Sequence, residues 1–177
     1  MKALIPFSIP VSGLRNGLHA YDFRVDDAFF GAFAESPVQS GDLSVHLDFD
    51  KRPGMYVMSF FLSGTVKTPC DRCLETIDLP VAGDYRLVVK FSEEERIDEA
   101  EVVYVSPNLE VLNVAQYVYE FIILSLPLIK VYNCEEDAEA VCNSDTLAYL
   151  EEADSSEEPA DQEEDTIWDE LKRQLNK

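Results

Sequence analysis

The sequence predicts an α+β fold in which a mostly antiparallel, curved, barrel-like sheet packs against one main buried helix. Apolar residues alternate with polar ones over the front two thirds of the chain, which is typical of strands. A single long apolar segment at helical spacing follows. We expect one α+β domain over residues 1–150, an acidic disordered linker over 151–165 and an amphipathic docking helix over 166–177.

The first predicted strands surround a turn signal. Residues 18–25 alternate loosely, and residues 43–50 alternate strictly between apolar and polar side chains, which indicates half-buried strands. The turn signal Arg52-Pro53-Gly54 follows, and the apolar run from Met55 to Val66 returns along the chain. The sequence therefore predicts an antiparallel hairpin.

Two more strands and a short helix complete the predicted sheet region. Asp26-Asp27 is expected to cap a short helix over residues 28–33. The alternation over 77–91 is loosened around Gly83, which predicts a bend or bulge that would curve the sheet. After an acidic loop, Val102-Val103-Tyr104-Val105 reads as a short strand.

The main helix is predicted from a change of period at Asn113. Asn113 and Gln116 resemble a capping box, apolar residues then recur at helical spacing as far as Leu126, and Pro127 stops the run. Apolar residues on more than one side predict that the helix is largely buried against the sheet.

The net charge of −21 is concentrated in the back half of the chain. Residues 1–92 contain 11 acids and 9 bases, whereas residues 93–165 contain 22 acids and 2 bases. Such a polyanionic segment repels nucleic acid and favours basic partners. Residues 151–165 have the composition of a disordered linker. Beyond them, Ile167, Trp168, Leu171 and Leu175 share one face of the predicted docking helix.

Several classes of protein are disfavoured by composition and motifs. No apolar run reaches the roughly 18 residues of a membrane span, and the first ten residues make a poor secretory signal, so we expect a cytoplasmic protein. The chain has no phosphate-binding glycine loop, nucleophile elbow or zinc-protease motif. Its many carboxylates read as a solvated charge run. We therefore expect no enzymatic activity.

The four cysteines are the strongest candidates for a metal site. A cytosolic location favours reduced thiols, and Cys70-Asp71-Arg72-Cys73 has the ligand spacing of a zinc knuckle. With Cys134 and Cys142 as the other ligands, the sequence predicts one structural zinc ion. The alternative is a bare turn with two incidental thiols downstream. A redox role is disfavoured because the motif lies between strands and not at a helix start.

The basic and aromatic residues of the front half suggest a mixed surface and a core. Lys67, Arg72, Arg86 and Lys90 are interleaved with acids, so they resemble an ordinary surface, yet they would supply any direct contact with RNA or a partner. No basic cluster accompanies the phenylalanines, which are expected to fill the core and not to stack on bases. They are Phe29, Phe30, Phe33, Phe60 and Phe61.

Several segments of the chain form a recognisable set. Gly64-Thr65-Val66 precedes Cys70-Asp71-Arg72-Cys73-Leu74-Glu75, Val89-Lys90-Phe91 precedes an acidic loop, Ile123-Leu124-Ser125-Leu126-Pro127 has a cysteine soon after, and Trp168-Asp169-Glu170-Leu171-Lys172 lies in the last predicted helix. Through these segments the chain resembles the YceD-like large ribosomal RNA subunit accumulation proteins over nearly its whole length. Many relatives carry several cysteines and a glycine in the second cysteine cluster, whereas this chain has only Cys134 and Cys142 there.

The resemblance implies a non-enzymatic accessory role in ribosome biogenesis, in the accumulation or processing of 23S ribosomal RNA. The expected partner is the large ribosomal subunit precursor, reached through a basic ribosomal protein, the 23S RNA or both, with no membrane or DNA partner. Two alternatives remain: an acidic chaperone for a basic ribosomal protein, and a thiol oxidoreductase.

Overall fold

The computed structural model describes residues 2–34, 36–94, 97, 101–133 and 142–156. The chain divides into two compact units, Met1–Cys142 and Asn143–Lys177. In chain order the elements are the 3-10 helix η1 (Lys2–Phe7), β1 (Ser8–Ile9), the 3-10 helix η2 (Val11–Gly13), β2 (Gly17–Val25), α1 (Asp27–Phe30), β3 (Ser40–Arg52), β4 (Met55–Pro69), β5 (Thr76–Phe91), β6 (Val102–Val105), β7 (Leu112–Asn113), α2 (Ala115–Leu124) and α3 (Ser144–Ser156).

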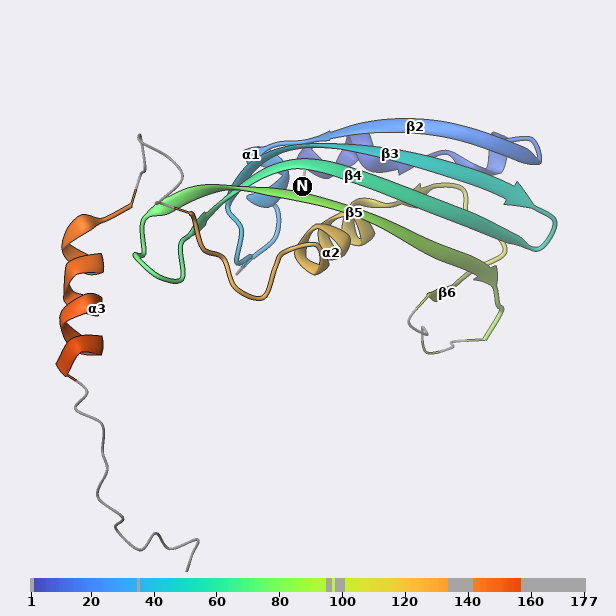
Figure 1. Ribbon diagram of the computed structural model, residues 1–177. Helices are drawn as coiled ribbons and strands as arrows, with labels where there is room; N and C mark the ends of the chain where they lie inside the picture. Colours follow the sequence, from blue (N-terminus) through green and yellow to red (C-terminus); the bar gives the residue numbers. More distant parts are fainter. Residues whose placement is uncertain (1, 35, 95–96, 98–100, 134–141, 157–177) are drawn as a thin grey trace, which may run out of the picture. The chain divides into compact units, whose positions relative to one another are not determined.

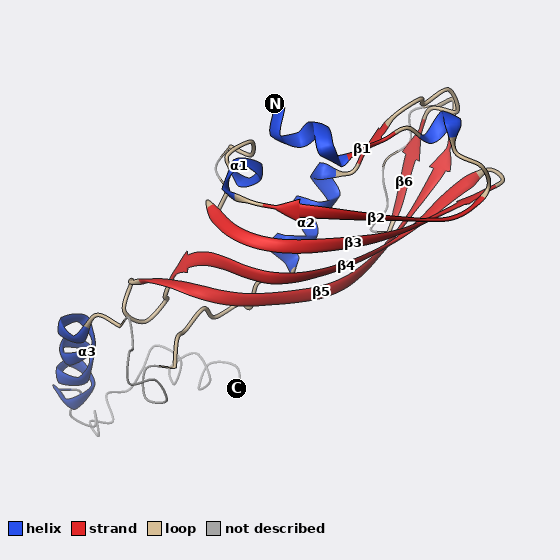
Figure 2. Cartoon of the chain, turned by 90° about the horizontal axis from the view of Figure 1, so that it is seen from above, coloured by secondary structure: helices blue, strands red, loops and turns tan. Residues whose placement is uncertain are grey.

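One five-stranded sheet dominates the first unit, in the order β2-β3-β4-β5-β6 (Figures 1 and 2). The first four strands are antiparallel neighbours, as the alternation predicted, and only β6 pairs parallel to β5. The described strands leave the sheet open, with β2 and β6 at its edges. The α+β class and the mostly antiparallel sheet are thus confirmed, whereas closure into a barrel is not.

The two faces of the sheet differ in what covers them. We call the inner face the one that carries Leu47, Phe60 and Tyr85, and the outer face the one that carries His46, Phe61 and Asp84. Helix α2 lies against the inner face (Figure 1), where Phe121 stacks on Tyr85 with ring centroids 4.6 Å apart. The aromatic residues of η1 and α1 complete this core.

Gly83 does not produce the predicted bulge. The register between β4 and β5 runs without interruption from Met55 opposite Lys90 to Pro69 opposite Thr76. A Cβ atom at position 83 would instead lie 2.6 Å from the Ser125 hydroxyl oxygen and 2.7 Å from the Tyr85 ring. The glycine therefore provides space for the chain that follows α2, and the curvature of β5 does not come from an extra residue.

Helices α1 and α2 occur where the sequence predicted them, but their first and last residues differ from the predicted ones. The Asp26 carboxylate accepts a hydrogen bond from the Phe29 N–H at 3.1 Å, which confirms the cap of α1. The capping box predicted for α2 is wrong by one residue, because Val114 holds the cap position and Gln116 bonds Glu120 instead. Asn113 still contributes, since its side-chain oxygen accepts from the Ala115 N–H at 3.0 Å.

Two short strands connect the N-terminus to the start of α2. Ser8 pairs with Asn113 and Ile9 with Leu112, and the Val114 N–H donates to the Phe7 carbonyl at 2.9 Å. Ile9 is fully buried. The N-terminal residues are therefore part of the core region.

Helix α3 belongs to the second unit. It is 13 residues long, and it extends into residues 151–156, which were predicted to belong to a linker. The predicted docking helix over 166–177 lies outside the described residues. None of the described helices combines the length and the apolar character that a membrane crossing requires.

Candidate functional site

The Cys-x-x-Cys turn joins β4 to β5, as the flanking strand patterns predicted. Its ends are held by two backbone hydrogen bonds, from the Cys70 N–H to the Glu75 carbonyl at 2.8 Å and from the Leu74 N–H to the Cys70 carbonyl at 2.9 Å. Leu74 adopts a φ of 65°, the only positive φ among the described residues other than glycine. A leucine in this conformation is strained, so the contacts around the turn must offset the strain and hold the backbone in place.

The segment after α2 is anchored to this turn. The Asp71 N–H donates to the Lys130 carbonyl at 2.7 Å, and the Lys130 N–H donates to the Asp71 carboxylate at 2.7 Å. The Lys130 ammonium lies 3.4 Å from the same carboxylate. Figure 1 shows the chain running from α2 to the end of the sheet where β4 turns into β5. The turn therefore connects the chain after α2 to the sheet through Asp71 and Lys130.

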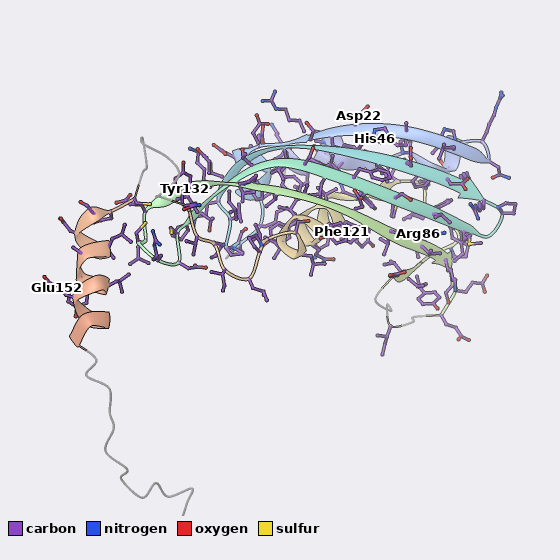
Figure 3. All side chains as sticks on the ribbon, in the orientation of Figure 1. Asp22, His46, Arg86, Phe121, Tyr132 and Glu152 are labelled. Atoms are coloured by element: carbon purple, nitrogen blue, oxygen red, sulfur yellow. The ribbon has the colours of Figure 1, made fainter. Side chains whose placement is uncertain are left out.

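The Cys70 sulfur lies in an environment that favours its thiolate. Both thiols of the turn are reduced and buried, with Cys70 0% and Cys73 1% exposed. Burial raises the pKa of Cys70, but the backbone N–H groups of Cys73, Tyr132 and Arg72 donate to its sulfur, and the net pKa is lowered. Tyr132, at the same end of the sheet (Figure 3), comes from the segment that Lys130 anchors.

The other two cysteines predicted as ligands are not seen beside this turn. Cys134 lies outside the described residues, and Cys142 is half-buried and disulfide-bonded. Among the residues that the structure describes, no group of three or more His, Cys, Asp or Glu side chains is arranged to hold a metal ion. The structure thus shows Cys70 and Cys73 as a buried pair of free thiols.

The outer face of the sheet is exposed and carries both signs of charge. Arg24 forms a two-point pair with Asp42 at 3.0 and 2.9 Å, and Arg52 pairs with Asp50 at 2.6 Å. Its carboxylates are those of Asp22, Asp42, Asp48, Asp50, Asp78 and Asp84.

Three of the four predicted contact residues share this outer face. Lys67, Arg86 and Lys90 are exposed on β4 and β5, whereas Arg72 is exposed on the Cys-x-x-Cys turn. Lys67 lies 3.4 Å from Asp78, while Arg86 and Lys90 form no ion pair with any described residue. Four residues along a strand correspond to roughly 13 Å, so Arg86 and Lys90 do not form a dense basic patch. Figure 3 shows Arg86 on β5.

Phe61 is the outer-face residue that the sequence predicted wrongly, and it lies beside His46. The His46 Nδ1 lies 2.7 Å from Asp22 and its Nε2 lies 3.4 Å from Asp48. The hydrogen bond to Asp22 is the main cause of a raised His46 pKa. Phe61, predicted as a core residue, is 43% exposed, with its ring centroid 6.3 Å from that of His46. The alternation of β4 places Phe60 inside and hence Phe61 outside, a signal that was present in the sequence.

The link between Asp71 and Lys130 was also missed. Its signal was weak but real, because Lys130 is one of only two bases in residues 93–165. A single base in a strongly acidic segment has many possible partners, so the sequence could not have identified the right one. Asp71 and Lys130 are separated by 59 positions in the chain.

Comparison with protein families finds one match. The family model described as the large ribosomal RNA subunit accumulation protein YceD covers residues 58–173, which include most of β4, all of β5, the Cys-x-x-Cys turn and α2. Comparison with curated proteins and with solved structures finds no significant match. On the strength of the family match, the chain belongs to the YceD family of large ribosomal RNA subunit accumulation proteins.

Proposed function

We propose that this protein is a non-enzymatic accessory factor in the assembly of the large ribosomal subunit, which supports the accumulation and processing of 23S ribosomal RNA in the cytoplasm. The family match over residues 58–173 is the observation that carries the proposal. The partner is the precursor of the large subunit, contacted through a basic ribosomal protein, the 23S RNA or both.

The buried thiols favour a structural role over an oxidoreductase. A thiolate that exchanges disulfides must reach its substrate, and the Cys70 and Cys73 side chains are 0% and 1% exposed. The lowered pKa of Cys70 comes from backbone donors that fix the turn. A dithiol-exchange assay on the reduced protein tests this assignment, and turnover of a disulfide substrate would contradict it.

The same turn supports a structural zinc ion as part of the proposal. Thiolate ligands must be deprotonated, and the lowered pKa of Cys70 meets this requirement at one ligand. Cys70 and Cys73 would hold the ion together with Cys134 and the reduced form of Cys142. The ion would connect the sheet to the chain that follows α2. Metal analysis of protein purified under reducing conditions should give close to one zinc per chain, lost in Cys70→Ser.

The charge distribution favours contact with a protein over contact with naked RNA. Neutralising phosphates needs clustered bases, whereas Lys67 is paired with Asp78 and the other predicted contacts are spread out. Any direct contact with RNA would therefore be made by Arg72, Arg86 and Lys90, and its affinity would be low. A basic ribosomal protein would be attracted by the chain's net charge of −21. The second candidate function is therefore an acidic chaperone for a basic ribosomal protein. Such chaperone activity could also be the way in which the assembly factor acts.

Affinity purification from cell extract, with and without ribonuclease, tests the main proposal. We expect large-subunit precursors to be recovered, and loss of the protein to lower the ratio of 23S to 16S RNA. Recovery that resists ribonuclease would indicate a protein contact. An unchanged RNA ratio together with no ribosomal component in the eluate would overturn the proposal.

Deletion of residues 151–165 tests the chaperone candidate. It removes nine acids and no base, so it should weaken binding of a basic large-subunit protein, most strongly at low salt where screening is weakest. Tight RNA binding by the isolated protein that survives this deletion and is lost in Arg72→Ala would favour direct RNA contact instead.

A further inference from the structure

The longest strand of the sheet has an edge that is only partly covered. Strand β5 extends over Thr76–Phe91, but β6 pairs only with Val88–Phe91. In the described part of the chain, no other segment pairs with this side of β5. An uncovered strand edge presents unpaired N–H and C=O groups and is a template for another strand.

The pairing pattern shows which backbone groups point outward. The Val88 N–H donates to the Glu101 carbonyl on the β6 side at 2.8 Å, so it points away from β4. Backbone groups alternate in direction along an antiparallel strand, and the groups of Ala82, Asp84 and Arg86 therefore also point outward. Pro80 fits this alternation, because its missing N–H faces the open side.

The uncovered edge has two ends. Pro80 cannot donate to an added strand, and β6 occupies the edge from Val88 onward. The gap between them, centred on Ala82–Arg86, has room for a strand of about five residues, which is an ordinary strand length. We call this stretch the β5 gap.

The two sides of the β5 gap differ in chemistry. On the outer face, Asp84 is exposed and forms no ion pair with any described residue. On the inner-face side, Ser125 bonds the Tyr85 hydroxyl at 2.8 Å, which places the chain after α2 beside the gap. The adjacent Leu124 is 68% exposed and Leu128 is 100% exposed. An added strand would therefore meet the Asp84 carboxylate on the outer face and the start of the chain after α2, at Ser125, on the inner-face side.

From this arrangement we propose that the β5 gap binds a short extended segment of a basic protein by strand addition, with basic and apolar side chains alternating along the segment. Successive side chains of a strand point to opposite faces, so alternate cations would face Asp84 and the apolar residues would face the inner-face side, where the chain after α2 carries the exposed Leu124 and Leu128. Arg86 lies on the same face and would repel a cation placed opposite it, so the attraction exerted by Asp84 acts mainly toward the Ala82 end of the gap. The choice of a basic occupant rests on the proposed function and on the net charge of −21.

The chain provides a matched pair of substitutions for the test. Ala82 and Ala20 are both exposed on the outer face, on the two outermost long strands β5 and β2. The same alternation of backbone groups, followed from β5 through β4 and β3 to β2, shows that the Ala20 N–H points away from β3, toward the open edge of β2. Proline at either position removes one outward donor, but only Ala82→Pro changes the β5 gap.

The probe is an acetylated nine-residue peptide of alternating lysine and valine, titrated into the full chain. We expect saturable binding at physiological salt, with slowed hydrogen exchange at the amides of Ala82, Asp84 and Arg86. Loss of a hydrogen bond and a blocked approach should weaken binding roughly tenfold in Ala82→Pro, with no change in Ala20→Pro. Asp84→Lys should also weaken binding, and more so at low salt.

Control peptides separate strand addition from charge attraction. A peptide with the lysines and valines in two blocks has the same charge, and one N-methylated at alternate amides cannot form the ladder, so both should bind at least tenfold more weakly. Equal binding of these peptides, protection at β2 in place of β5, or no binding of the alternating peptide would overturn the proposal. If Ala82→Pro does not fold, binding by Asp84→Lys and binding of the N-methylated peptide still test whether the segment adds to β5 as a strand.

The outcome is separable from that of the proposed function. A chain that is recovered with large-subunit precursors while Ala82→Pro and the peptides have no effect would refute strand addition and leave the assembly role standing. Conversely, peptide binding at β5 by a chain that recovers no ribosomal component would support the site and refute the assembly role.

Discussion

Phe60 and Phe61 are neighbours in the sequence and lie on opposite faces of the same strand. Phe60 is 0% exposed on the inner face, with its ring centroid 5.1 Å from that of Phe121 in α2. Phe61 is 43% exposed on the outer face beside His46. Figure 3 shows the same contrast, with Phe121 on one side of the sheet and Asp22 and His46 on the other.

The two faces of the sheet therefore have different roles. The inner face removes apolar area from water and supplies the stability of the first unit. The outer face carries charged side chains, and the β5 edge carries backbone groups that no described strand covers. If this division is right, substitutions on the two faces should differ strongly in their effect on the free energy of unfolding.

The largest expected effect is that of Phe60→Ala. Removing a fully buried aromatic ring loses its transfer free energy and leaves a cavity against α2, at a cost of about 3 to 5 kcal/mol. Denaturant unfolding followed by circular dichroism measures this loss. A loss below about 1 kcal/mol would mean that α2 does not pack on the sheet as described.

Gly64→Ala should have the second largest effect, because it brings the two central strands into conflict. Gly64 has a φ of 155°, and an added Cβ would overlap the Asp42 carbonyl and lie 2.6 Å from the Leu43 Cα. Strain and overpacking together should cost about 2 to 4 kcal/mol. Gly54→Ala is the control, since its φ is 82° but nothing lies within 4 Å of the added atom. Equal losses in both would show that overpacking contributes nothing.

Phe61→Ala should change stability by less than about 1 kcal/mol, because the ring is already partly in water. Comparing the thermal unfolding of Phe61→Ala with that of Phe60→Ala gives the sharpest test of the difference in stability contribution between the two faces. A comparable loss in both variants would break the comparison, since it would require the outer face to be covered.

The smallest effect is expected from pH, at His46. The bond to Asp22 raises the pKa of His46 in the folded protein above its unfolded value of about 6.5. The folded state thus binds the proton more tightly, so the contribution to stability is full below the unfolded pKa and is lost as pH rises through the folded pKa. Chemical-shift titration of His46 should show the raised pKa in the wild type, reduced in Asp22→Asn. An unchanged pKa in that variant would assign the shift to another group, such as Asp48.

Periodicity predicted the strands and the main helix well, because burial on one face dictates the alternation of each strand. From β2 to β5 the strand order follows the chain order, with short turns at β3–β4 and β4–β5 and a longer connection through α1 at β2–β3. The parallel pairing of β6 was not predictable from its four residues, since a strand that short has no pattern that fixes its direction. The role of Gly83 was also hidden, because it depends on Ser125, which is 42 positions away.

The candidate site was predicted in part. Ligand spacing and flanking strands identified the Cys-x-x-Cys turn and its position correctly. The bonds that connect it to Lys130, and the N–H of Tyr132 that points at the Cys70 sulfur, involve backbone groups, which a sequence pattern does not reveal. The β5 gap could not be predicted for a related reason, because an edge is defined by the absence of a neighbour.

The pairing of β1 with β7 imposes an order of events during synthesis. Ser8 and Ile9 leave the ribosome early, but their partners Asn113 and Leu112 are more than a hundred residues behind. At a translation rate of about 5 to 20 residues per second, the N-terminal strand waits for roughly 5 to 20 seconds before its partner exists. During that interval the β2–β3–β4 meander, whose contacts are local, can form first, since local pairings close faster than distant ones. Completion of the core around Ile9 is therefore among the last steps of folding.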